Sequence, residues 1–265
     1  MPKVKVGDIE VYYEVHGDGF PLVMIMGLSA NIDWWDPRLI HETSKRYKTV
    51  VFDNRGAGRT DKPKVTFTIK MFADDTTGLM DVLNIGRAHV LGISMGGMIA
   101  QELAFNHPDK VEKLVLCSTT CGGSNAIPPT PQALGILMRP WNGMTDKEVI
   151  GSMNSILFTD DFVKSNTAYM GAVTQQLLKA PMPEDAYRRQ VAAISNFDMY
   201  DRLGAIRAPT LVMHGRKDIL VPPENAKILA DKIPAAKLIY FENSAHALFS
   251  QESDKVNKAL LDFLK

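Results

Sequence analysis

Short apolar runs alternate with longer segments in which apolar residues recur at helical spacing along most of this chain. Two short strands are predicted within residues 4–15, turning at Gly7-Asp8. Later strands are predicted at 21–26, 49–52, 88–91, 111–116, 209–214 and 237–241, and helices at 35–47, 69–83, 97–105, 224–232 and 254–264. Strands and helices in regular alternation predict an α/β fold, with a mostly parallel, doubly wound sheet between two helical layers.

The alternation stops near Cys121. Glycines at 122–123 and prolines within 128–131 interrupt the pattern, and the residues that follow show helical spacing without a strand until residue 209. We therefore expect residues 1–120 and 206–265 to form one core domain. Residues 121–205 are predicted to be a helical cap inserted into it.

Composition and charge narrow the class of protein. A length of 265 residues suits one α/β domain with an insertion better than two independent domains. Lys plus Arg and Asp plus Glu both total 30, so the formal net charge is zero and neither a nucleic-acid nor a membrane partner is expected. No apolar run approaches the roughly 18 residues of a membrane span. The alternating N-terminus also lacks the apolar core of a signal peptide, which favours a cytoplasmic protein.

The chain has two cysteines, Cys117 and Cys121. They could pair or bind a metal, but without a histidine beside them they do not make a zinc site. Free, buried thiols in a reducing cytosol are the favoured interpretation, and no metal is expected.

The segment Gly92-Ile93-Ser94-Met95-Gly96 lies between a predicted strand and a predicted helix. A G-x-S-x-G sequence in this position forms a sharp turn that exposes the serine hydroxyl. A side chain at either glycine would collide with the neighbouring strand or helix. The turn also places Ser94 at a helix N-terminus, where free N–H groups favour developing negative charge. Ser94 is therefore the predicted nucleophile; a glycine-rich turn with a solvated serine is the alternative.

A serine nucleophile needs a base, and the base needs an acid to orient it. His246 lies in a loop directly after the strand 237–241, and Asp218 follows the preceding strand in the same way. Functional groups of doubly wound sheets gather at such strand ends, so His246 is the predicted base and Asp218 its orienting acid. Asp218 could instead cap the helix that follows Pro222-Pro223. The other histidines are interpreted as surface, structural or packing residues: His16, His41, His89, His107 and His214.

The oxyanion formed by acyl transfer needs hydrogen-bond donors. Met95, which follows the nucleophile, supplies one backbone N–H. The second is expected from Leu28, in the loop after the strand 21–26, where Gly27 permits a tight turn.

With serine, aspartate and histidine in this order, the chain resembles the α/β-hydrolase superfamily over nearly its whole length outside the cap. The segment Asp53–Thr60 looks like the D-x-R-G-x-G-x-S/T loop of the small single-domain members, and Ser94–Gly97 matches their S-M-G-G. Met26-Gly27 departs from the H-G that usually precedes the oxyanion turn. A serine nucleophile argues against haloalkane dehalogenases and epoxide hydrolases. The resemblance is to carboxylesterases, enol-lactonases and cofactor-free haloperoxidases, and it implies no cofactor.

Apolar and methionine-rich residues of the cap, together with two tryptophans after the oxyanion turn, are candidates for the substrate pocket. The candidates are Trp34, Trp35, Met138 and Trp141. Most apolar cap residues are expected to pack the cap helices against the core, and core packing is the equal alternative for the two tryptophans. The cap has no lysine or arginine cluster for a polyanionic substrate, so an uncharged ester of modest size is expected.

The sequence thus predicts a serine carboxylic-ester hydrolase acting on a small molecule. A lactone hydrolase or a carbon–carbon bond hydrolase would use the same residues. A receptor with this fold and little turnover is the alternative from a different class. Nothing in the sequence indicates an oligomeric state.

Overall fold

The computed structural model describes residues 3–265, and the strands within this range form one eight-stranded sheet. Their order across the sheet is β1-β2-β4-β3-β5-β6-β7-β8, with antiparallel pairing at β1–β2–β4 and parallel pairing from β4 to β8. The strands are β1 Lys3–Val6, β2 Ile9–His16, β3 Phe20–Ile25, β4 Tyr47–Phe52, β5 Ala88–Ile93, β6 Val111–Cys117, β7 Thr210–Gly215 and β8 Lys237–Phe241. The predicted mostly parallel sheet is confirmed.

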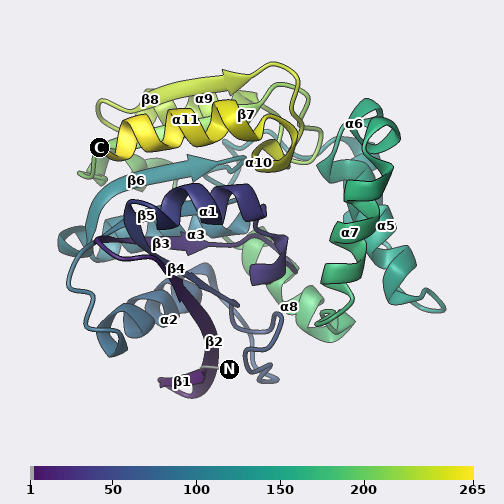
Figure 1. Cartoon of the computed structure of the whole chain (residues 1–265), viewed down its shortest axis with the longest axis horizontal. Helices are drawn as coiled ribbons and strands as arrows, with labels where there is room; N and C mark the ends of the chain where they lie inside the picture. The colour runs from purple at the N-terminus through teal and green to yellow at the C-terminus, as the bar shows by residue number, and fades with distance from the viewer. Residues whose placement is uncertain (1–2) are drawn as a thin grey trace.

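Helices cover both faces of the sheet (Figure 1). Strand β3 shows that both faces are buried. Val23 and Ile25 join the buried cluster on one face, whereas Leu22 and Met24 join the cluster on the other. Because both faces are buried, the strand is apolar throughout rather than alternating. The first face is covered by α2 Ile69–Val82, α3 Met95–Asn106 and α9 Glu224–Lys232, and the second by α1 Pro37–Ser44, α10 Leu248–Gln251 and α11 Ser253–Leu264.

The chain between β6 and β7 is helical. It forms α4 Pro131–Met138, α5 Asp146–Leu157, α6 Asp160–Ser165, α7 Thr167–Leu177, α8 Glu184–Ser195 and the 3₁₀ helix η3 Tyr200–Ala205, all of which fall within the expected insertion. Helices α5, α6 and α7 stand away from the sheet in Figure 1, whereas α8 lies closer to it. Tyr187 of α8 is fully buried with Met153 and Ile156 of α5 in a small cluster of their own. Ala193 of α8 and Leu203 of η3 instead join the buried cluster on the first face of the sheet, so the insertion packs partly on itself and partly on the core.

The first helix is shorter than predicted. Asp36 accepts a hydrogen bond from the backbone N–H of Arg38 and Pro37 occupies the first helical position, so α1 begins at Pro37 instead of residue 35. A short 3₁₀ helix, η1 Ile32–Trp34, precedes it, and β4 already begins at Tyr47. A further 3₁₀ helix, η2 Pro108–Lys110, links α3 to β6.

Two smaller expectations concern the cysteines and the membrane. Cys117 and Cys121 are both free and buried, and burial raises the pKa of each thiol. Among residues 3–265, none of the helices has the length and apolar character needed to cross a bilayer.

Candidate active site

Ser94 occupies the turn between the end of β5 and the start of α3. Its backbone has φ 57° and ψ −124°, a strained conformation that typically costs about 1–3 kcal/mol. A Cβ atom on Gly92 would lie 2.2 Å from the carbonyl oxygen of Gly96, and one on Gly96 would lie 2.1 Å from that of Ile25. Both positions therefore require glycine, as the sequence predicted, because strand, turn and helix approach each other too closely for a side chain.

Neighbouring strand ends hold this turn in place. The Ser94 N–H donates to the carbonyl of Cys117 at 2.9 Å, and the Thr119 hydroxyl donates to the carbonyl of Ser94 at 2.7 Å. Both partners come from the end of β6 and the loop after it. The strained backbone of Ser94 is thereby fixed on two sides, with its side chain at the wall of a cavity.

Asp218 and His246 are in direct contact. His246 Nδ1 lies 2.7 Å from Asp218 Oδ2, and the backbone N–H groups of Leu220 and Val221 each donate to Asp218 Oδ1 at 2.9 Å. Burial alone would raise the pKa of Asp218, but the charge of His246 and the hydrogen bonds from His214 and His246 outweigh it and lower the pKa to about 2. Asp218 is thus a buried, ionised carboxylate in direct hydrogen-bond contact with His246. It does not cap α9, whose N-cap residue, Pro223, makes no side-chain cap.

The predicted oxyanion donors lie on two segments that touch. A Cβ atom on Gly27 would come within 3.0 Å of Ser94 Cβ, so the loop carrying Leu28 packs directly against the serine turn. Within residues 3–265, the N–H groups of Leu28 and Met95 donate to no other group. Two free donors beside a serine hydroxyl are what a developing oxyanion requires.

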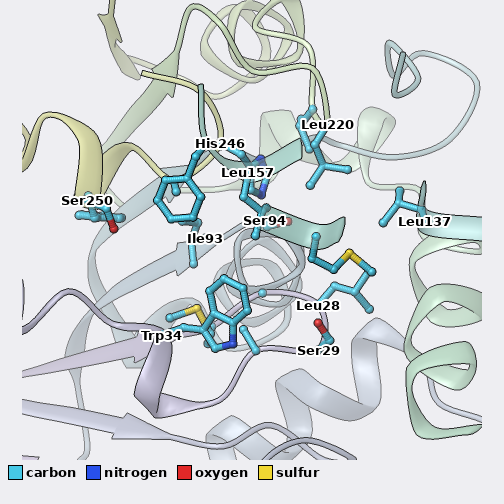
Figure 2. A pocket seen from close by; sticks show the side chains of 18 of the residues that line it. Leu28, Ser29, Trp34, Ile93, Ser94, Leu137, Leu157, Leu220, His246 and Ser250 are labelled. Carbon is cyan, nitrogen blue, oxygen red and sulfur yellow. The ribbon is translucent and has the colours of Figure 1, made fainter. Parts of the chain in front are cut away.

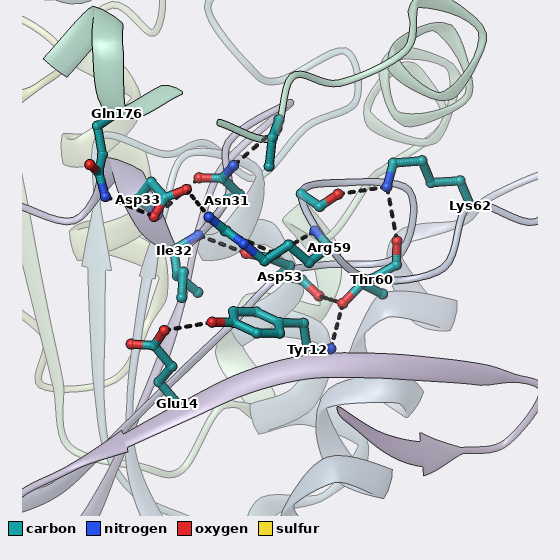
Figure 3. Close-up of polar contacts among 12 residues, drawn as sticks. Tyr12, Glu14, Asn31, Ile32, Asp33, Asp53, Arg59, Thr60, Lys62 and Gln176 are labelled. Carbon is teal, nitrogen blue, oxygen red and sulfur yellow. Dashed lines mark hydrogen bonds and ion pairs between the residues drawn. The ribbon is translucent and has the colours of Figure 1, made fainter. Parts of the chain in front are cut away.

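A polar network around Asp53 holds the residues that follow Leu28 (Figure 3). The fully buried carboxylate of Asp53 accepts hydrogen bonds from the N–H of Ile32 at 2.8 Å and of Arg59 at 2.7 Å, and burial raises the pKa of Asp53. Asn54 donates to the carbonyl of Met26 at 2.8 Å. The segment Asp53–Thr60, noted in the sequence as a family motif, therefore acts as a brace for the loop that carries Leu28.

A cavity of about 210 Å³ opens beside Ser94 and His246, and its wall is mostly apolar. In Figure 2 the two side chains lie near the middle of the cavity, with Ser250 towards one end and Leu137 towards the other. Trp34 and Trp35 both contribute to the wall, and Trp35 also packs in the buried cluster on the second face of the sheet.

The cap supplies different lining residues from those predicted. Met138 is 54% exposed and does not reach the cavity; its neighbour Leu137 does, because adjacent residues on a helix point about 100° apart. Trp141 lies beside a separate, smaller cavity and packs on Tyr187, with ring centroids 4.6 Å apart. The sequence shows that helix α4 is apolar, but not which of its side chains face the cavity.

Comparison with known proteins decides the family. The family model for the alpha/beta hydrolase fold matches residues 21–253. The chain belongs to this family. Among relatives, this α/β-hydrolase is 29% identical over 259 residues to a protein named as a carbamate hydrolase (RutD) in Caulobacter sp. strain K31, covering 96% of this chain and 95% of that protein. The protein of the same name in Azorhizobium caulinodans is 27% identical over 263 residues, covering 99% and 98%.

Solved structures give the same family. The enol-lactonase from Burkholderia xenovorans LB400 superimposes with a TM-score of 0.87 at 25% identity, covering 99% of both chains. A thermophilic esterase from Thermogutta terrifontis gives a TM-score of 0.85 at 25% identity, covering 100% of this α/β-hydrolase and 98% of that chain.

Two site residues of this α/β-hydrolase were not foreseen from the sequence. The buried His214 Nε2 lies 3.2 Å from Asp218 Oδ2 and 2.8 Å from the carbonyl of Val221. The carbonyl can only accept, so Nε2 carries the proton and His214 is a second donor near the carboxylate. Gln190 of α8 accepts a hydrogen bond from the N–H of Ser29. A strand-end histidine and a cap glutamine carry no local motif that would have marked them.

Proposed function

We propose that this α/β-hydrolase cleaves carboxylic esters of small to medium, uncharged substrates through an acyl-enzyme. One observation carries the proposal: the serine at the strained turn and the His246–Asp218 pair meet at the same apolar cavity. Asp218 engages Nδ1 of His246, which leaves Nε2 to exchange a proton with the serine. The proposal includes no cofactor, nucleic acid or membrane.

The reaction proceeds in two halves. Ser94 Oγ attacks the ester carbonyl carbon while His246 Nε2 takes its proton, and the N–H groups of Leu28 and Met95 hold the oxyanion. The tetrahedral intermediate collapses, the ester C–O bond breaks, and His246 returns the proton to the leaving alcohol. Water then attacks the acyl-enzyme with His246 as base, which releases the carboxylic acid and restores Ser94. Asp218 stabilises the imidazolium in both halves.

The cavity favours an uncharged substrate. Neither lysine nor arginine contributes to its wall among the described residues, and the carboxylate in the wall, Asp36, is paired with Arg38. A carbamate anion would have no cationic partner there, and burying an unpaired charge is costly. An uncharged carbamate ester offers the same carbonyl group as a carboxylic ester. The carbamate hydrolysis in the relatives' name is therefore compatible with the proposed chemistry only if the carbamate is an uncharged ester.

The test is hydrolysis of a series of p-nitrophenyl esters, from acetate to long acyl chains. We expect turnover to be highest at short or medium chains and to vanish in Ser94→Ala. Ser155→Ala, at an exposed serine of α5, is the matched control and should behave as the unaltered protein.

Turnover that is no greater than in Ser94→Ala on every ester would overturn the proposal. Lactones and β-diketones would then be assayed with the same variants, since hydrolases for those substrates use the same residues. Binding without turnover would favour the receptor alternative.

A further inference from the structure

One end of the cavity is polar, although most of its wall is apolar. Tyr169, from α7, lies there with its hydroxyl oxygen 2.8 Å from Ser250 Oγ and 3.1 Å from Asp36 Oδ2. All three residues contribute to the cavity wall. Figure 2 shows Ser250 on one side of Ser94 and His246, and the apolar Leu137 on the other. The two ends of the cavity therefore differ in chemistry.

The direction of the hydrogen bonds follows from the partners. Arg38 binds the Asp36 carboxylate with Nε at 3.0 Å from Oδ1 and Nη2 at 2.9 Å from Oδ2. A carboxylate oxygen can only accept, so Tyr169 donates its single proton to Asp36. Burial, chiefly, and the nearby Asp36 raise the pKa of Tyr169 to about 12, so this proton is present at neutral pH. Ser250 then donates to the Tyr169 oxygen, and the lone pairs of Ser250 Oγ remain available as acceptors.

Charge selects the kind of donor that this acceptor would bind. Arg38 neutralises Asp36, so the polar end carries no net charge to attract a cation. A buried ammonium group would lose its hydration without gaining an unpaired anion. An uncharged hydroxyl group can donate to Ser250 Oγ at a much smaller cost of desolvation.

We propose that Ser250 accepts a hydrogen bond from a terminal hydroxyl group of the substrate, so that the preferred esters are hydroxylated at the end remote from the scissile bond. The inference rests on the proposed ester hydrolysis. Without a partner at this end, an apolar cavity would disfavour a hydroxyl relative to a methyl group. Since Ser250 is already paired with Tyr169, an unsubstituted ester leaves no buried group unsatisfied. The preference is therefore modest, about fivefold in kcat/KM, the size of one net hydrogen bond.

The experiment compares matched esters that differ by one hydroxyl group. One pair, p-nitrophenyl hexanoate and p-nitrophenyl 6-hydroxyhexanoate, places the hydroxyl on the acyl side. A second pair, hexyl acetate and 6-hydroxyhexyl acetate, places it on the alcohol side. We expect the hydroxylated ester to be preferred in one of the pairs, and p-nitrophenyl 6-aminohexanoate to be a poorer substrate than its hydroxyl counterpart.

Variants of Ser250 test whether this residue causes the preference for the hydroxylated ester. Ser250→Ala should bring the ratio of kcat/KM values within the preferred pair to about one or below, because one hydrogen bond is lost. Ser250→Thr keeps the hydroxyl and should retain the ratio, as should Ser155→Ala. The ratio within a pair is unaffected by a general loss of folded protein.

Each of the other possible outcomes contradicts either one part of this inference or the proposed function. If both pairs are hydrolysed in a Ser94-dependent manner with no preference for the hydroxyl, the inference fails and the proposed function stands. A preference that survives in Ser250→Ala would show that Ser250 is not the acceptor. A preference for the ammonium ester over the hydroxyl ester would show that the site does not select an uncharged donor. If no ester is hydrolysed at all, the proposed function itself fails.

Discussion

The side chain of Gln190, on cap helix α8, accepts a hydrogen bond from the backbone N–H of Ser29 at 2.9 Å and donates one to the carbonyl of Arg55 at 3.0 Å. Ser29 follows the proposed oxyanion donor Leu28, and Arg55 belongs to the brace beneath the same loop. A single fully buried cap residue thus connects the loop with its support. Further contacts join the cap to the residues after this loop: Asn31 donates to the carbonyl of Ala180 and Gln176 donates to Asp33.

Gln190→Leu should lower kcat on a good ester substrate about tenfold while changing KM little. Loss of one oxyanion donor costs roughly 10²–10³ in rate, and Gln190 acts one step away by positioning the N–H of Leu28. Steady-state kinetics measure the split between kcat and KM. Gln175→Leu, at an exposed position of α7, is the matched control. A raised KM with unchanged kcat would mean that Gln190 shapes the pocket and does not position the donor.

Asp218→Asn should reduce kcat by about 10⁴, because an amide no longer fixes the tautomer of His246 or stabilises the imidazolium. Since the pKa of Asp218 is lowered to about 2, the carboxylate stays ionised throughout the range in which esters are assayed. Any loss of activity between pH 7 and pH 5 must then come from another group. Pre-steady-state kinetics with a p-nitrophenyl ester would locate the effect in acylation, and a variant with more than a tenth of the original kcat would refute the assigned role.

His89→Phe should make the protein less sensitive to acid. His89 lies between the rings of Phe20 and Tyr47, with centroid distances of 4.8 and 5.6 Å. Burial, followed by the charge of Lys113, lowers its pKa from 6.5 to about 4. As pH falls from 6.5 to 4, the unfolded chain takes up a proton that the folded protein does not, so stability decreases over that window. At pH 7 the imidazole is neutral in both states and this effect is absent.

Urea unfolding of the unaltered protein and of His89→Phe at pH 7 and pH 5 measures the difference. The free energy of unfolding should fall less for the variant between the two values. Equal falls in both proteins would show that His89 does not contribute to acid sensitivity.

Gly96→Ala should destabilise the protein by about 3 kcal/mol or more, because the new methyl group would meet a backbone carbonyl that cannot move aside. Gly151→Ala offers a control on helix α5, where a Cβ atom would have nothing within 4 Å. That substitution should stabilise the protein by about 0.5–1 kcal/mol through the unfolded state. Thermal unfolding of both variants tests the pair; similar effects at the two glycines would contradict the steric account.

The sequence predicts those parts of the site that depend on local spacing. Ser94 could be recognised because a glycine at each side of a serine, between a strand and a helix, has a steric meaning within five residues. Asp218 and His246 could be paired because both follow strands that are consecutive in the chain, and consecutive parallel strands end at the same edge. These inferences need no knowledge of distant contacts.

The remaining site residues depend on contacts that span the chain. Gln190 reaches a loop 161 residues earlier, and no pattern within α8 distinguishes it from a solvated glutamine. The choice between Met138 and Leu137 depends on the rotation of α4, which the mostly apolar segment does not specify. His214 could be placed at the end of a strand, but its approach to Asp218 depends on how the following turn folds back.

The insertion has two parts, helices α4 to α7 and helix α8, which differ in how freely evolution or design could exchange them. Helices α4 to α7 supply side chains such as Leu137 and Tyr169 to the cavity wall, so replacing them would change which substrates fit. Replacing α8 would also remove Gln190 and disturb the loop that carries Leu28. A graft of a foreign cap should therefore join the chain before Pro183 and leave α8 in place, which would alter substrate choice while retaining the chemistry.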